Sequence, residues 1–488
     1  MTTGRKLANT CALVILLNLV VSAQTQTTPP LPSAPRSVSF PKPVERILPN
    51  GLRVIVVERH NTTLVTAMLV IKNGGEVDPQ ELAGVSDLTA SLLTKGTTTR
   101  SATRVAEEVE GLGGSLDSGA QWDSSRVSVG VMSAKIGPAM SIVADVVREP
   151  TFRNDEIERL RQQSIDMLTL ALDEPNSIAR FVGTKVLYGD EPYGHPISGT
   201  LESLKRISRS DILKLHRLFY RPDNAILLIG GDINSSAGFH LATRYFGTWS
   251  KPRNPLPTLS VASTTVAGRT GRVVVIDKPD AGQAAVFLIR RGIDRKDSDY
   301  YRGIVTNSVL NGYSGRLNQE IRIKRGLSYG AGSSLDARRS VGPFVAQAQT
   351  KNESGAVVAD LLKSEVERLS AAPTADAELT PRKAVLIGDF ARNLETVNGL
   401  VSRIASLALH GLSLNEINHY IDNVQAITAA DVQRFASMKL DAKSSDIIIV
   451  GNSKAFLPDL QKRYADVEVI PFKELDLNTR LLRKKQVQ

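Results

Sequence analysis

The segment ISRSDI at residues 207–212 recurs as ITAADV at residues 427–432, an offset of 220 residues. In each copy a hydroxyl residue, Ser208 or Thr428, stands three positions before an aspartate. A hydroxyl at this position can cap free amide groups at the start of a helix, and the carboxylate is favoured near the positive end of the helix. Both copies therefore predict the first turn of a helix.

Two further pairs of segments share almost the same offset. AILLIGG at 225–231 matches DIIIVG at 446–451, and RVIVV at 53–57 matches RVVVI at 272–276. Short apolar runs of this kind are typical of buried strands. Three matches at nearly one offset indicate two homologous α/β domains of roughly 220 residues each.

The domain boundaries follow from the repeat and from composition. We place an N-terminal domain at residues 44–250 and a C-terminal domain at 271–475, joined by a linker at 251–270 that contains Pro252, Pro255 and Pro257, followed by Ser, Thr and Gly. Within the first domain we expect strands at 64–72 and 124–132 and helices at 83–94 and 103–112. Because strand and helix runs are mixed rather than strictly alternating, the pattern predicts an α+β fold with mixed, largely antiparallel sheets covered by helices.

Residues 1–23 have the form of a secretory signal peptide. Arg5 and Lys6 precede an apolar run at 12–21, and VSA at 21–23 supplies the small residues that a signal peptidase prefers. A membrane anchor is the alternative, but the run is about half as long as a bilayer crossing requires. We therefore expect a soluble periplasmic or secreted protein, with no membrane span after cleavage and with a disordered leader at 24–43 that is rich in Thr, Pro and Ser.

Cysteine use and charge exclude several classes of function. The only cysteine, Cys11, lies in the signal segment, so the exported chain would have no disulfide, thiol nucleophile or thiolate zinc ligand. The formal net charge of +10 becomes +8 without Arg5 and Lys6, but the charges are scattered and aromatic residues make up only 5%. This pattern argues against a nucleic-acid partner. The RKK run at 483–485 is interpreted as part of a solvated basic tail at 476–488.

A family resemblance begins at NGGEVD, residues 73–78, a glycine-bearing turn after a strand. It continues through AGV at 83–85 and TKGT at 94–97, and later through YGHP at 193–196 and FYRPDN at 219–224. These segments resemble the M16 zinc peptidases, the insulinase, pitrilysin and mitochondrial-processing-peptidase-like family, over nearly the whole exported chain. The resemblance implies two M16-type (LuxS/MPP-like) domains.

In that family the first helix carries His-x-x-Glu-His. The two imidazoles, at positions i and i+4, bind zinc, and the glutamate acts as a base toward the metal-bound water. Alignment between GV at 84–85 and KGT at 95–97 places the two histidines at Asp87 and Ser91 and the glutamate at Ala90. The family's third ligand, a glutamate on a later helix, falls at about Met167, with Asp166 as a neighbouring alternative. The resemblance thus implies an M16B-type subunit that has lost its metal site.

No other zinc site is evident among the histidines. The chain has six, and no pair shows the i, i+4 spacing. His195, within YGHP, is interpreted as part of a structural turn. We therefore expect no metal and no other cofactor in this chain.

The second domain keeps a different part of the family's site. RLNQEIRIKRGLSY, residues 316–329, resembles the family segment in which an Arg and a Tyr stand seven positions apart, here Arg322 and Tyr329. We expect a helix over 316–324 that Gly326 ends, and a strand that begins at Tyr329. The resemblance implies that this pair reaches the zinc site and donates hydrogen bonds to the oxyanion or holds the substrate backbone. The alternative is a surface ion pair of Arg322 with Glu320 or a neighbour.

The glycine-rich segment NGYSG, residues 311–315, lies just before this pair. Its spacing matches no phosphate-binding loop. It is interpreted either as a flexible connection or as the loop that leads into the following helix.

Three functions from different classes remain open. The first is a noncatalytic subunit, inactive alone, that pairs with a His-x-x-Glu-His-bearing M16 subunit and supplies Arg322 and Tyr329 to the partner's zinc site, where a peptide or unfolded polypeptide is hydrolysed. The second is an inactive peptide-binding or structural homologue. The third is a lone peptidase that uses other ligands.

Overall fold

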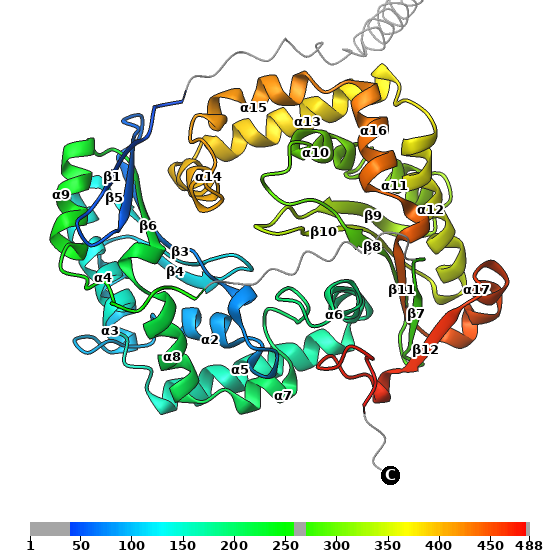
Figure 1. Cartoon of the computed structure of the whole chain (residues 1–488), viewed down its shortest axis with the longest axis horizontal. Helices are drawn as coiled ribbons and strands as arrows, with labels where there is room; N and C mark the ends of the chain where they lie inside the picture. Colours follow the sequence, from blue (N-terminus) through cyan, green and yellow to red (C-terminus); the bar gives the residue numbers. More distant parts are fainter. Residues whose placement is uncertain (1–39, 258–269, 485–488) are drawn as a thin grey trace, which may run out of the picture. The chain divides into compact units, whose positions relative to one another are not determined.

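The computed structural model describes residues 40–257 and 270–484 and contains two six-stranded sheets (Figure 1). The signal segment, nearly all of the leader and most of the linker predicted at 251–270 lie outside these residues. The first sheet has the order β1-β2-β6-β3-β5-β4, in which only β2 and β6 are parallel. Its strands are β1 (Val44–Ile47), β2 (Arg53–Glu58), β3 (Leu64–Ile71), β4 (Ser115–Ala120), β5 (Ser125–Met132) and β6 (Ala225–Gly231).

The second sheet repeats five strands of the first in the same order. Its order is β12-β7-β11-β8-β10-β9, with β7 parallel to both β11 and β12. Its strands are β7 (Val273–Asp277), β8 (Ala284–Arg291), β9 (Ser328–Leu335), β10 (Pro343–Thr350), β11 (Asp446–Gly451) and β12 (Val467–Pro471). The sixth strand differs, because β1 is antiparallel to β2 whereas β12 is parallel to β7. The predicted α+β class, with mixed and largely antiparallel sheets, is confirmed.

The helices follow a matching order in the two halves of the chain. The first half contains α2 (Val85–Leu92), α3 (Ala102–Gly111), α4 (Ile136–Arg148), α5 (Asn154–Asp173), α6 (Pro175–Tyr188), α7 (Leu201–Arg206), α8 (Arg209–Phe219) and α9 (Ser235–Phe246). The second contains α10 (Tyr300–Leu310), α11 (Arg316–Asn318), α12 (Gly355–Ala371), α13 (Asp376–Leu394), α14 (Val397–Leu409), α15 (Glu416–Gln425), α16 (Ala429–Lys439) and α17 (Leu457–Arg463). The two predicted helix starts are confirmed as reciprocal capping boxes, at Ser208 for α8 and at Thr428 for α16.

The central strands of each sheet are buried on both faces, which explains why they are continuous apolar runs, whereas the outer strands are partly exposed. In β2, Val54 and Val56 pack in the core of the first half, while Ile55 and Val57 face the core that contains α14. The helix pairing is reciprocal: α14 lies on β6 and β3 of the first sheet, and α6 lies on β8 and β11 of the second (Figure 1).

Glycine allows the close approach of α14. A Cβ on Gly230 of β6 would lie 2.5 Å from a methyl carbon of Val401, nearer than such atoms approach. Each half of the molecule thus buries a helix in the other half, so the two sheets belong to one packed unit.

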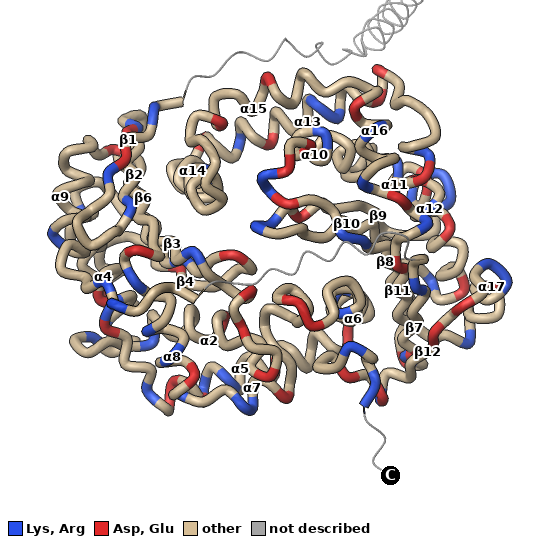
Figure 2. Tube along the Cα trace, viewed as in Figure 1, with Lys and Arg blue, Asp and Glu red and all other residues tan. Residues whose placement is uncertain are grey.

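Two further observations concern the ends and the surface of the chain. Leu477 and Leu482 are buried in an apolar cluster with the second sheet, and Arg483 pairs with Glu474 at 3.1 Å, so the prediction of a solvated tail is wrong at these residues, whereas Leu481 is 74% exposed. Basic and acidic residues are interspersed along both halves (Figure 2). None of the helices in the described ranges is long and apolar enough to cross a membrane.

Candidate functional site

Helix α2 carries the positions of the lost metal ligands, and a buried carboxylate fixes where it begins. Asp78 accepts hydrogen bonds from the amides of Gly84 and Ser86, at 2.9 and 3.1 Å, and from the Ser86 hydroxyl. Gly84 has a positive φ of 93° and packs on Gly199, where a Cβ would lie 2.9 Å from the Gly199 backbone. The helix therefore starts at Val85, within the range predicted from the sequence.

The side chains at the four motif positions do not form a zinc site. Asp87 is mostly buried, and burial raises the pKa of its carboxyl to about 6. Ala90 is buried, Ser91 is half-buried, and Met167 on α5 is 55% exposed. Asp166, the alternative to Met167, accepts a hydrogen bond from Gln162 at 2.8 Å.

A single carboxyl group with a hydroxyl, a methyl and a thioether is a poor ligand set for zinc, which prefers imidazole, thiolate and carboxylate. Within residues 40–257 and 270–484, no group of three or more His, Cys, Asp or Glu side chains is arranged to hold a metal ion. The residues present therefore do not match the metal that the resemblance implies for a catalytic M16 chain.

His195 lies in a buried turn rather than in an open site. Its Nε2 is 3.1 Å from the carbonyl oxygen of Gly75, its ring packs against Trp122, and burial lowers its pKa. These contacts connect YGHP to the turn before α2.

Arg322 occupies an irregular helical turn. The predicted helix over 316–324 is corrected by the structure: α11 covers only Arg316–Asn318, and a π-helical turn follows over Gln319–Ile323. Gly326, with a φ of 63°, closes this turn, since its amide bonds to the Arg322 carbonyl and the Leu327 amide bonds to the Ile321 carbonyl, both at 2.9 Å. This is the helix end predicted at Gly326, and it reverses the chain toward Tyr329.

Tyr329 lies at an irregularity of strand β9. Ser328 faces Thr350 and Ala331 faces Ala348, so two residues of β9, Tyr329 and Gly330, stand opposite one residue of β10. Such a β-bulge redirects side chains. Tyr329 is 88% exposed, and no described residue forms a hydrogen bond with its hydroxyl.

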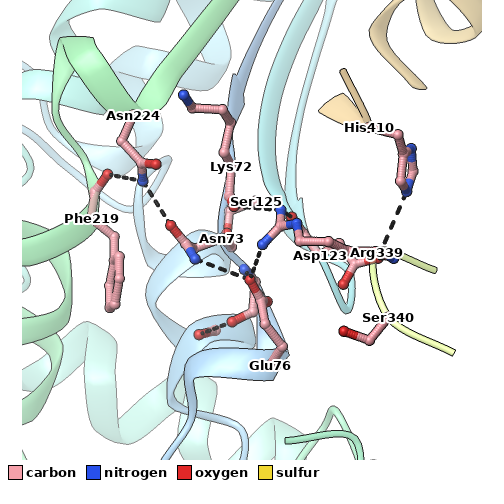
Figure 3. Close-up of polar contacts among 12 residues, drawn as sticks. Lys72, Asn73, Glu76, Asp123, Ser125, Phe219, Asn224, Arg339, Ser340 and His410 are labelled. Atoms are coloured by element: carbon pink, nitrogen blue, oxygen red, sulfur yellow. Dashed lines mark hydrogen bonds and ion pairs between the residues drawn. The ribbon is translucent and has the colours of Figure 1, made fainter. Parts of the chain in front are cut away.

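The tip of the β9–β10 hairpin fixes the far end of β9 against the first sheet (Figure 3). The Arg339 guanidinium lies 2.9 Å from Glu76 and donates to the carbonyl oxygens of Lys72 and Asp123 at 2.6 and 2.7 Å. The Arg339 amide donates to the Asp123 carboxylate at 2.7 Å, and His410 lies 3.9 Å from the same carboxylate. These contacts hold the strand that bears Tyr329 in place relative to the first half of the chain.

Burial strongly affects the two carboxyl groups of this cluster. Burial raises the pKa of Glu76 to about 7, against the attraction of Arg339 and the hydrogen bond from the Gly74 amide. Burial also opposes ionisation of Asp123, but the nearby His410 side chain and the hydrogen bonds from the Tyr193 hydroxyl and the Arg339 amide outweigh it, so the pKa of Asp123 is lowered.

Glu76 is expected to make stability depend on pH between about 4.5 and 7. The folded protein keeps a proton on Glu76 up to about pH 7, whereas an unfolded chain releases it near 4.5. The contribution of this group to the free energy of unfolding is therefore full below pH 4.5 and falls as the pH rises to 7, by about 3 kcal/mol. Urea denaturation at pH 5 and pH 8 should show that Glu76→Gln gains stability relative to the wild type at the higher pH. Parallel pH profiles would contradict the pKa of Glu76.

This cluster is not evident from the sequence. Glu76 and Arg339 are 263 positions apart, and neither belongs to a recognisable spacing pattern. The signal in the sequence is the turn NGGEVD, residues 73–78, whose glycines indicate a turn but whose glutamate has no partner that the sequence identifies.

Comparisons with known proteins place these features in a family. Residues 53–200 match the family model described as insulinase (peptidase family M16), and residues 206–386 match the one described as peptidase M16 inactive domain. An uncharacterized zinc protease of Mycobacterium leprae is 25% identical over 398 residues, which cover 81% of this chain and 89% of that protein.

Solved structures show the same fold. An M16 inactive domain structure from Pseudomonas fluorescens has a TM-score of 0.77 at 24% identity and covers 84% of this chain and 98% of its own. A protease from Helicobacter pylori has a TM-score of 0.79 at 22% identity and covers 85% of this chain and 100% of its own.

Proposed function

Because the chain belongs to the M16 (insulinase) family, we propose that it is the zinc-free subunit of a two-subunit M16 peptidase in the periplasm or outside the cell. In this proposal a partner subunit with an intact His-x-x-Glu-His motif holds the zinc, and this chain supplies Arg322 and Tyr329. The substrate is a peptide or an unfolded polypeptide. The chain alone does not hydrolyse it.

The exposure of the pair at two local irregularities supports this function. A π-helical turn and a β-bulge are both enriched at functional sites, and here each coincides with one residue of the pair. The Tyr329 side chain is 88% exposed, so packing does not explain why a large aromatic residue stands at this position. Both side chains are exposed, and their donors form no hydrogen bond with any residue in the described part of the chain.

The chemistry of peptide hydrolysis gives these donors a use. Attack of water on a peptide carbonyl builds negative charge on the carbonyl oxygen, and a phenol and a guanidinium can both donate to it. One donor that is fixed in place before the reaction is worth about 3 kcal/mol of transition-state stabilisation. Arg322 can also hold a substrate carbonyl before the reaction begins.

The purified chain is expected to carry less than about a tenth of an equivalent of zinc, because its motif positions offer no adequate ligand set. Elemental analysis after gel filtration measures this content. With fluorescein-labelled casein as the unfolded polypeptide, hydrolysis should appear only after mixing with the His-x-x-Glu-His-bearing M16 chain of the same organism. A partner whose motif glutamate is changed to glutamine is the inactive control.

Two other results of these measurements would favour the peptide-binding homologue or the lone peptidase instead. Tight binding of casein with no cleavage in any mixture would favour the peptide-binding homologue. Near-stoichiometric zinc with activity in the isolated chain, lost on Asp87→Asn or Asp166→Asn, would overturn the zinc-free assignment.

A further inference from the structure

Tyr313 lies beside Arg322 at the tip of the turn that precedes α11. The Cζ atom of Arg322 is 5.7 Å from the centroid of the Tyr313 ring, within the range of a cation–π contact. Tyr313 is 72% exposed, so its ring does not contribute to a core. An exposed aromatic ring next to an exposed guanidinium needs an explanation other than packing.

The turn that carries Tyr313 is held by hydrogen bonds. The Asn318 side chain donates to the Tyr313 carbonyl at 2.6 Å, and Gly312 has a φ of 87° that favours glycine. Arg382, itself buried, donates to the Asn311 carbonyl at 3.2 Å and to the Ser314 hydroxyl. Residues 311–315 therefore form the loop that leads into α11, and these hydrogen bonds hold the backbone that carries the Tyr313 ring.

The carboxylate of Glu320, which was the alternative partner of Arg322, is paired with two other cations. Glu320 pairs with Lys324 at 2.9 Å and with Arg325 at 2.8 Å, and the hydrogen bonds from these two cations, with Lys324 foremost, lower its pKa despite burial. No ion pair of Arg322 occurs within residues 40–257 and 270–484, so the alternative of a surface ion pair with Glu320 is wrong. Among the described residues, the contact of the Arg322 guanidinium is the one with the Tyr313 ring.

We propose that Tyr313 is a positioning residue that holds the guanidinium of Arg322 in the orientation used at the partner's active site. The ring contact itself stands on the geometry, and its effect on turnover rests on the proposed function. Arginine is long and flexible, so a ring that restricts it before substrate arrives lowers the cost of ordering it in the transition state. For an exposed cation–π contact the expected effect on turnover is about two- to fivefold.

The contact can be tested in the isolated chain by NMR with arginine labelled at Nε, using Arg322→Lys to assign the resonance. The ring should shift the Hε resonance of Arg322 upfield in the wild type and in Tyr313→Phe, which keeps the ring. Tyr313→Leu should move this resonance to the position of a freely moving arginine. An unchanged resonance in Tyr313→Leu would overturn the proposal.

The consequence for turnover is measured in the mixed complex. Tyr313→Leu should lower kcat about two- to fivefold, with Tyr313→Phe at the wild-type value. Tyr245→Leu is the matched control, because it removes a similar contact with Arg244, 5.5 Å from that ring on α9, and should change neither the Arg322 resonance nor turnover.

Two outcomes separate this proposal from the one on which it rests. If Arg322→Ala lowers turnover while Tyr313→Leu shifts the resonance without lowering turnover, Tyr313 has no positioning role. If Arg322→Ala leaves turnover unchanged while the resonance still depends on the ring, the contact stands and the proposed function fails.

Discussion

Tyr329→Phe is expected to lower turnover of the mixed complex by about 10²-fold, the loss typical of one oxyanion donor. The substitution removes only a hydroxyl that forms no hydrogen bond with the described residues, on a ring that is 88% exposed. Neither folding nor assembly should change, because no buried contact is lost. Initial rates of casein hydrolysis, measured with gel filtration of the same samples, separate chemistry from assembly.

Two further variants help to interpret this result: Arg322→Ala tests the second residue of the pair, and Tyr245→Phe is the control. Arg322→Ala should cause a comparable loss of turnover and can also raise KM, since a guanidinium can hold the substrate backbone before the reaction. Tyr245→Phe makes the same chemical change on α9, away from the pair, and should have no effect. Full activity of both Tyr329→Phe and Arg322→Ala in an intact complex would mean that the pair has no role in catalysis, and would favour the peptide-binding homologue.

The repeat predicted much of the fold because its signals are local. A hydroxyl three positions before an aspartate specifies a capping box wherever the chain places the helix, and both α8 and α16 begin in this way. Apolar runs that end at glycine became β6 and β11, the central parallel partners of β2 and β7. Equivalent segments then occupy equivalent places in the two sheets.

The reciprocal exchange of α6 and α14 could not be predicted in this way. The apolar face of a helix shows that something covers it but not which sheet does so. The close approach that decides the pairing depends on Gly230, which lies 171 positions earlier in the chain than Val401.

The sequence predicted which residues belong to the candidate site but not the backbone geometry around them. The spacing of Arg322 and Tyr329 and the end at Gly326 are visible in the sequence. The π-helical turn and the β-bulge are not, because both result from fitting α11 and β9 to their neighbours. The bulge depends on the register with β10, and the turn before α11 depends on Arg382, far along the chain.

Arg339→Ala is expected to lower the free energy of unfolding by about 3 kcal/mol at pH 8. The substitution removes the partner of a buried carboxylate and leaves the carbonyl oxygens of Lys72 and Asp123 without their donor. The backbone hydrogen bond from residue 339 to the Asp123 carboxylate should survive. Urea denaturation can be followed by the fluorescence of Trp122, whose ring packs on the neighbouring Arg338, in a Trp249→Phe background.

The size of this loss should depend on pH, which distinguishes it from a simple loss of packing. Above pH 7 the wild type holds Glu76 ionised beside Arg339, and the variant must either bury that charge unpaired or bind a proton. At pH 5.5 Glu76 is already protonated, so only the hydrogen bonds are lost and the cost should fall to about 2 kcal/mol. Arg153→Ala, which breaks an exposed ion pair with Asp155, is the control and should produce no measurable change at either pH.

A double variant shows whether Glu76 and Arg339 act as one unit. If the loss comes from an unpaired buried charge, Glu76→Gln combined with Arg339→Ala should cost less at pH 8 than the two single changes added together. A loss that is additive and independent of pH would instead mean that Arg339 stabilises the hairpin tip through its hydrogen bonds alone. The coupling therefore tests whether the contact between the two halves of the chain, at the far end of the strand that carries Tyr329, is electrostatic in origin.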